Sequence, residues 1–157
     1  PSLADLGGPD RGFASWAAQD SVSEIQDAQY VTPQSRPKSV NQLAEKIIKD
    51  RGEVLASLRT IAHDENFSLP GKASPQQKQV RTKLKNLPAD TQAHPNDTQR
   101  AQAYVSSEIG HLQQEIGRFQ EEASSGANDE LKSFAQKYLP LIQDELKMAR
   151  SINLAAG

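Results

Sequence analysis

The stretch LAEKIIKDRGEVLASLRTIA, residues 43–62, decides the fold class of this chain. Its apolar residues recur every three or four positions, which is the period of an α-helix with one face turned toward a core. The same period recurs elsewhere, so the sequence predicts long helices over about 11–31, 39–66, 97–123 and 129–152. Aromatic residues make up only 5% of the 157, whereas Ala, Gln, Glu, Lys and Leu are abundant, and we therefore expect an all-α protein.

The connections between these helices predict how they are joined. The segments that follow the first and third helices, 32–38 and 124–128, are short, and short connections make consecutive helices antiparallel neighbours. The middle connection, 67–95, is long and contains one short amphipathic helix that Ser74 caps. One long crossover is typical of ferritin-like bundles, so we expect an antiparallel four-helix bundle of that type, with a simple up-down-up-down order as the alternative.

This four-helix bundle is expected to be a single domain over residues 11–154. Residues 1–10 are rich in Gly and Pro and are predicted to be a flexible lead-in. Pro140 falls inside the fourth helix and is expected to kink it, because proline has no backbone N–H and crowds the preceding turn.

Composition excludes several classes of function. Eighteen Lys and Arg residues against twenty Asp and Glu residues give a formal charge of −2, which supplies no field for binding nucleic acid. No apolar run approaches the ~20 residues that a membrane-spanning helix needs, so we expect no transmembrane segment. The absence of cysteine excludes disulfides, thiolate metal ligands and a cysteine nucleophile.

Each predicted apolar stripe contains ionisable residues. Projection at the helical period places a charged side chain between apolar neighbours in all four long helices. Burying a lone charge costs roughly several kcal/mol. These groups therefore need partners of opposite charge, a metal ion or a shifted pKa. We predict a buried polar cluster made of Glu24, Asp50, Arg51, Tyr104, Glu108, His111 and Glu145.

Two interpretations of this cluster compete. In the first, which we favour, Arg51 donates to the carboxylates in a buried ion-pair network, and no metal or other cofactor is expected. In the alternative, an iron, manganese or zinc ion is bound as in ferritin-like metal-binding proteins and oxidases, by Glu24, Glu108, His111 and Glu145. Glu108 and His111 have the Glu-x-x-His spacing of such sites, but the chain has only one such pair, and a guanidinium cannot ligate a metal. A third reading leaves some of these residues solvated at the bundle ends.

Other polar residues form no recognisable catalytic motif. His63 and His94 are expected to lie in solvent. The crossover carries Lys72, Lys78, Arg81, Lys83 and Lys85 without an acidic residue among them. We interpret these as a solvated face, with attachment to an anionic membrane or cell-wall surface as the alternative.

Four stretches, taken in order, carry a family resemblance. They are FASWAAQDSVSEIQ, LAEKIIKDRGEVLASLRTIA, AYVSSEIGHLQQEIGRFQEEA and LKSFAQKYLPLIQDELKMA. The chain resembles the bacterial predicted-outer-membrane-protein family, domain of unknown function four-one-four-two, over residues 11–154. The resemblance implies a secreted or periplasmic ferritin-like bundle of unestablished activity.

The resemblance also implies which residues correspond to the family's polar positions. The family's first-helix Glu matches Glu24, and its third-helix His matches His111. Arg51 and Glu145 stand where the family has its other two histidines. If those histidines bind a metal, the resemblance implies that this chain has lost or altered the site.

The resemblance implies a protein of the bacterial envelope, periplasmic or outer-membrane-associated, and we expect a binding or stress-related role rather than an enzyme. We expect a monomer or weak dimer whose partner is an envelope surface or another protein. The alternative function is a ferritin-like metal-binding protein or oxidase.

Overall fold

The computed structural model describes residues 7–31, 38–86 and 97–152, and all regular secondary structure in these ranges is helical. Four helices are long: α1 (Gly8–Val31), α2 (Lys38–Asp64), α4 (Asp97–Ser125) and α5 (Asp129–Ser151). A short helix, α3 (Gln79–Lys85), lies between α2 and α4 in the chain. The predicted all-α class is confirmed, and each expected long helix is present.

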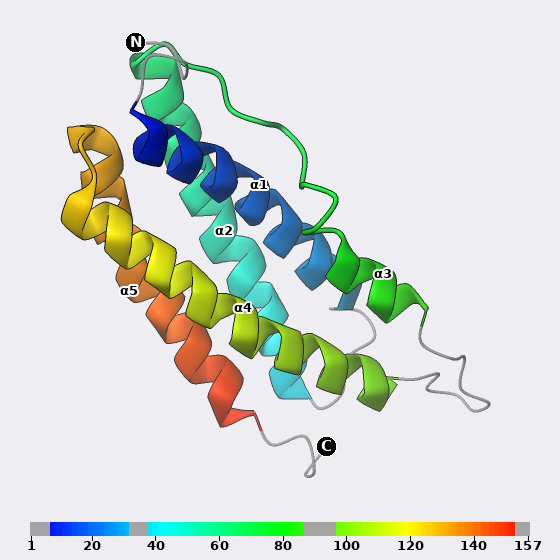
Figure 1. Ribbon diagram of the computed structural model, residues 1–157. Coiled ribbons are helices and arrows are strands. Elements are labelled where there is room, and N and C mark those ends of the chain that lie inside the picture. The colour runs from blue at the N-terminus through cyan, green and yellow to red at the C-terminus, as the bar shows by residue number, and fades with distance from the viewer. Residues whose placement is uncertain (1–6, 32–37, 87–96, 153–157) are drawn as a thin grey trace.

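The long helices pack in pairs that follow one another around a shared core. α1 contacts α2 and α4, and α5 also contacts α2 and α4. The chain that leaves the end of α2 returns along the molecule toward α3, so that α2 and α4 begin at the same end (Figure 1). Neighbouring long helices are therefore antiparallel, while α2 and α4, which the long connection joins, run in the same direction (Figure 1).

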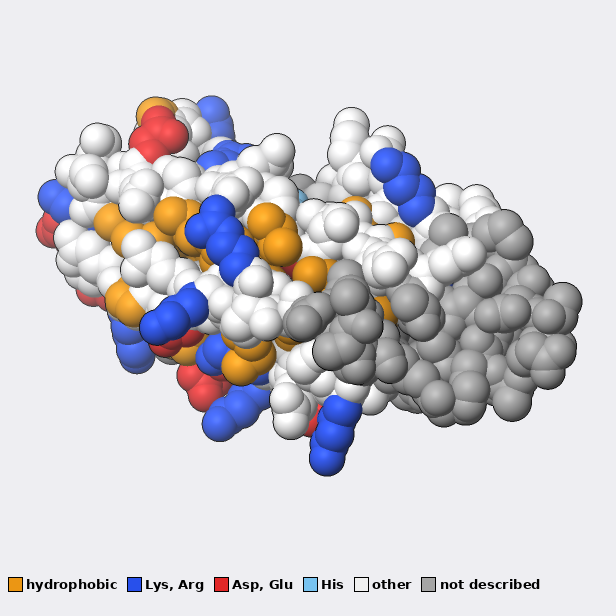
Figure 2. Space-filling view, turned by 90° about the horizontal axis from the view of Figure 1, so that it is seen from below, with side chains coloured by type: hydrophobic (Ala, Val, Ile, Leu, Met, Phe, Trp, Pro, Cys, Tyr) orange, Lys and Arg blue, Asp and Glu red, His pale blue; other side chains and the backbone are white. Residues whose placement is uncertain are grey.

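Aliphatic residues make up most of the hydrophobic core, and a group of aromatic residues packs near the start of α1. Phe13, Trp16, Phe119, Phe134 and Tyr138 form successive ring contacts there, and the Phe13 and Phe119 ring centroids are 5.1 Å apart in an edge-to-face arrangement. No large hydrophobic side chain is exposed among the residues that the structure describes. Figure 2 shows one face, on which hydrophobic atoms form small patches between Lys and Arg side chains. No helix in the described ranges has the length and the apolar character needed to cross a membrane.

The start of α1 differs from the sequence expectation. The helix begins at Gly8, so residues 8–10 of the predicted lead-in are helical, while residues 1–6 lie outside the described part. The physical reason is Asp10, a buried residue whose carboxylate accepts hydrogen bonds from the backbone N–H groups of Ala127 and Asn128 at 3.2 and 3.0 Å. This contact ties the first turn of α1 to the connection between α4 and α5.

α2 ends in a motif that its sequence encodes. Asn66 has a φ of 59°, in the left-handed region that Asn tolerates better than most residues. The N–H of Phe67 donates to the carbonyl of Ala62 at 2.9 Å, and the N–H of Asn66 donates to that of His63 at 3.3 Å. These two bonds satisfy carbonyls of the last helical turn and reverse the chain into the crossover.

The crossover is attached to α1. Ser74 and Gln77 form a reciprocal capping pair one turn before α3 begins, since the Ser74 N–H donates to Gln77 Oε1 at 2.8 Å and the Gln77 N–H to Ser74 Oγ at 3.2 Å. The Ser23 hydroxyl of α1 donates to the Gln77 carbonyl at 3.0 Å. Arg81, one of the predicted solvated cations, donates to Gln26 Oε1 at 2.8 Å in an exposed hydrogen bond. His94, which was expected to lie in solvent, is outside the described residues.

α5 continues through its internal proline. Pro140 lies within Asp129–Ser151, and the N-cap of that helix is Asn128, whose side chain accepts from the Leu131 N–H at 3.0 Å. The expected kink at Pro140 stays a prediction.

Candidate functional site

Ionisable side chains from all four long helices meet inside the molecule. α1 contributes two acids, α2 an arginine, α5 one acid, and α4 two acids and a histidine. All are at most 2% exposed except the histidine, whose side chain is 28% exposed. We call this set the polar cluster: Asp20, Glu24, Arg51, Glu108, His111, Glu115 and Glu145.

Arg51 is surrounded by four carboxylates. Glu145 accepts hydrogen bonds from Nη2 at 2.7 Å and from Nε at 3.1 Å. Nη1 forms ion pairs with Glu115 and, at 3.5 Å, with Asp20, while Nη2 lies 3.9 Å from Glu24. A fully buried guanidinium is tolerated here because these carboxylates supply opposite charge from three other helices.

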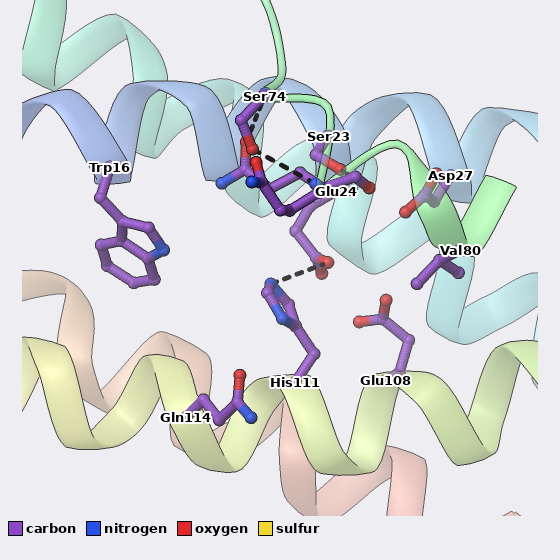
Figure 3. Close-up of a pocket in the computed structure, with 11 residues that line it drawn as sticks. Trp16, Ser23, Glu24, Asp27, Ser74, Val80, Glu108, His111 and Gln114 are labelled. Carbon is purple, nitrogen blue, oxygen red and sulfur yellow. Dashed lines mark hydrogen bonds and ion pairs between the residues drawn. The ribbon is translucent and has the colours of Figure 1, made fainter. Parts of the chain in front are cut away.

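His111 lies where three of the same carboxylates present their other oxygens. Its Nε2 is 2.5 Å from Asp20 Oδ1, 3.3 Å from Glu115 Oε1 and 3.6 Å from Glu24 Oε1. Figure 3 shows His111 and Glu24 pointing toward one another from α4 and α1. One atom each of Asp20, His111 and Glu115 lies within 4.8 Å of the others, a spacing at which three groups can bind one metal ion.

The polar cluster contains more acid than base. Five carboxyl groups face one guanidinium and one imidazole, so full ionisation would leave an excess of negative charge away from water. Burial raises the pKa of Glu115 and of Glu145 to about 8, although the Arg51 charge opposes the rise. For His111, burial alone would lower the pKa, but the hydrogen bond to Asp20 and the nearby carboxylates raise it to about 10. The cluster therefore holds protons in the absence of another cation.

Glu108 and Tyr104 lie on one side of the polar cluster, and each has a buried oxygen without a hydrogen-bond partner among the described residues. Burial and the neighbouring Glu24 carboxyl raise the pKa of Glu108 well above its usual value, and a side-chain hydrogen bond joins the two acids. Burial likewise raises the pKa of Tyr104. Within the described part of the chain, Glu108 Oε2 and the Tyr104 hydroxyl have no hydrogen-bond partner. Such unsatisfied buried atoms are rare and call for an explanation.

A cavity of about 320 Å³ leads to the cluster. Its walls come from α1, α4 and the crossover, and Figure 3 shows Glu24, Asp27, Glu108 and His111 around it. Asp27 lies at its edge, 3.7 Å from Arg81, and burial together with the Glu24 charge raises the pKa of Asp27 to about 7. The cavity therefore connects solvent to the His111 side of the cluster past acidic side chains, whereas the Arg51 guanidinium is only 1% exposed.

The structure brings most of the predicted site residues together. Glu24, Arg51, Glu108, His111 and Glu145 all belong to the polar cluster, and Tyr104 interacts electrostatically with its acids. Asp50 is also buried, but it pairs with Lys46 at 2.8 Å instead of with the guanidinium. Consecutive residues on a helix point in different directions, so Asp50 and Arg51 face different surroundings.

Sequence reasoning omitted Asp20 and Glu115 from the predicted set. Both carried a usable signal, because Asp20 precedes Glu24 by one helical turn and Glu115 follows His111 by one turn. Glu108, Glu115 and Glu122 also recur every seven residues, which places all three on the buried stripe of α4.

His63 was expected in solvent and lies there. Its side chain is 90% exposed and its Nδ1 is 3.4 Å from the neighbouring Asp64.

Trp16 lies at the cavity wall and packs against Phe119. The Arg118 guanidinium lies 4.2 Å from the centroid of the Trp16 ring.

Comparison with known proteins identifies the family. Residues 2–152 match the family described as Domain of unknown function (DUF4142). No curated protein and no solved structure matches the chain. The match spans nearly the whole sequence, and the chain therefore belongs to the DUF4142 family.

Proposed function

We propose that this protein binds a divalent cation between α1 and α4, through Asp20, Glu24, His111 and Glu115. One observation carries the proposal: the imidazole Nε2 has an oxygen of each of these three carboxylates within 3.6 Å. Carboxylate and imidazole donors together suit manganese, ferrous iron and zinc.

Charge and hydrogen bonding support the same proposal. A divalent cation would offset the excess of buried carboxylates, which otherwise keep protons at raised pKa values. It would also give the unpartnered Oε2 of Glu108 a nearby positive charge. The acidic cavity beside His111 offers such an ion a path from solvent.

We further propose that the protein is a ferritin-like four-helix bundle of the bacterial envelope, with a role in binding rather than catalysis. The long connection between α2 and α4 and their shared direction support this bundle type (Figure 1). The envelope location rests on the family resemblance alone. Fractionation of cells that express the natural gene tests it, because recovery in the cytoplasmic fraction would exclude an envelope location.

Manganese binding tests the proposed site. The purified protein is stripped with a chelator, titrated with Mn²⁺ in a calorimeter, and analysed for metal after desalting. We expect about one equivalent per chain, and a loss of affinity of 10-fold or more in His111→Gln and in Asp20→Asn, since the first removes the imidazole ligand and the second the negative charge of a carboxylate ligand.

His63→Gln is the matched control, because it removes an exposed imidazole 90% open to solvent. It should bind Mn²⁺ as the unaltered protein does. If the unaltered protein retains neither Mn²⁺ nor Zn²⁺, or if His111→Gln binds as tightly, the proposed site is wrong.

A further inference from the structure

We infer that the Arg51 guanidinium occupies the place of a second cation, so that the centre holds one metal ion beside a fixed internal charge. This inference rests on the proposed cation site and specifies its stoichiometry. It follows from how the carboxylates divide their oxygens between Arg51 and His111.

Three carboxylates bridge the two positions. Asp20 places Oδ1 against His111 and Oδ2 against Arg51, at 2.5 and 3.5 Å. Glu24 places Oε1 toward His111 at 3.6 Å and Oε2 toward Arg51 at 3.9 Å. Glu115 divides its oxygens in the same way, with Oε1 3.3 Å from His111 and Oε2 paired with Arg51.

A carboxylate that divides its oxygens in this way faces two centres of positive charge. In sites with two metal ions, about 3.5–4 Å apart, shared ligands hold both ions. Here Glu145 acts as an end group on the Arg51 side only, because Oε1 accepts from both Nη2 and Nε. The Arg51 position therefore has four carboxylates from three helices, a ligand supply that suits a hard divalent cation.

The guanidinium excludes a metal ion from that position. It has no acceptor atom and does not deprotonate in proteins, so it cannot become a ligand. The Arg51 side chain is also enclosed, at 1% exposure, and its charge repels a second ion. On the His111 side, the described residues that line the cavity include no arginine, and the cavity reaches the imidazole.

Removal of the charge should open the second position. In Arg51→Ala the four carboxylates lose their cation and gain space, so we expect the variant to bind two Mn²⁺ ions per chain. Arg51→Lys is the matched control, because it retains a positive charge at the same place and should bind one.

Elemental analysis of Mn²⁺-loaded protein measures the number of bound ions, and electron paramagnetic resonance shows whether two ions are coupled. The unaltered protein and Arg51→Lys should show one equivalent with the spectrum of an isolated ion, whereas Arg51→Ala should show two equivalents with the spectrum of an exchange-coupled pair. Circular dichroism with and without Mn²⁺ records whether Arg51→Ala folds, and Arg51→Gln replaces it if the alanine variant is unfolded in both.

The outcomes separate this inference from the proposed function. One equivalent in both the unaltered protein and the neutral variant would overturn the inference and leave the proposed function standing. No metal in the unaltered protein but one equivalent in the neutral variant would overturn the proposed function and the inferred stoichiometry, and would leave only the cation position at Arg51. No metal in any variant would overturn both.

Discussion

Arg51 is the residue on which the interior of this protein depends most. The Arg51 guanidinium, whose side chain is only 1% exposed, loses its hydration. The charges of Glu145, Glu115 and two more distant acids compensate for that loss. Burial would lower the pKa of Arg51, but the Glu115 and Glu145 charges outweigh it and raise that pKa further. Arg51 therefore keeps its positive charge, and the neighbouring carboxylates depend on that charge.

We expect Arg51→Met to lower the free energy of unfolding of the metal-free protein by about 3–5 kcal/mol, because it leaves several buried carboxyl groups without their cation. Denaturant titration followed by circular dichroism measures this. Arg59→Met is the control, since it makes the same change on the exposed face of the same helix and should stay within about 0.5 kcal/mol. Equal effects of the two substitutions would mean that Arg51 is not a buried charge.

Individual contacts were the least predictable feature of the sequence. Helical periodicity placed Arg51 and Glu145 on inward faces, but their 2.7 Å contact depends on how α2 and α5 are rotated against each other. The same limit explains Asp50, which lies on α2 beside Arg51 and yet pairs with Lys46 one turn away. A stripe drawn on one helix specifies burial but not which side chain of a neighbouring helix it will meet.

At the level of elements, the connection between α4 and α5 is held by close contacts. The Gly126 N–H donates to the Glu122 carbonyl at 2.9 Å, and Asp10 binds the next two backbone N–H groups. A Cβ at Gly126 would lie 2.6 Å from that carbonyl oxygen and closer still to the Glu122 carboxyl. The sequence predicted a short connection over 124–128, but it did not show that Asp10 of α1 would bind the backbone of this connection.

We expect Gly126→Ala to destabilise the protein by about 1–3 kcal/mol, since the new methyl group must displace either backbone or the buried Glu122 carboxyl. Gly117→Ala provides the comparison, because a Cβ at that exposed position of α4 meets nothing within 4 Å. That substitution should stabilise the helix by about 0.5–1 kcal/mol. Thermal melts of both variants measure the effects, and a Gly126→Ala protein as stable as Gly117→Ala would contradict the close packing.

For the whole molecule, sequence predicted the class of fold because helical period, caps and connection lengths all agree. The apolar stripes and the long segment before α4 were both readable without coordinates. The internal charge balance was not, because it depends on Asp20 and Glu115 meeting across α1 and α4. The result is a protein whose interior carries more acids than bases, and this imbalance has a consequence for stability.

Without metal, the protein should become less stable as the pH rises from about 5 to about 8. Glu122 and Glu145 illustrate the sign: burial raises the pKa of each from 4.5 to about 8 in the folded state, with Arg51 opposing the rise at Glu145. Between pH 4.5 and about 8 the folded state binds more protons than the unfolded chain, so the free energy of unfolding falls as the pH increases. This decrease approaches about 1.4 kcal/mol per pH unit for each carboxyl group with a raised pKa. The raised pKa of His111, about 10, acts in the same direction, because the stability from its charged form is lost as the pH rises from 6.5 through that value.

Urea unfolding at pH 5, 6.5 and 8 in the presence of a chelator measures this dependence. Glu122→Gln should reduce the slope, because it removes one titrating group that is 4% exposed, hydrogen-bonded to Asp10 and remote from the proposed ligands. Mn²⁺ should oppose the trend, since metal competes with protons for the same carboxylates and imidazole and binds more tightly as the pH rises. A stability that increases from pH 5 to pH 8 in the metal-free protein would show that the buried carboxyls are ionised and paired, and the need for a further cation in the cluster would disappear.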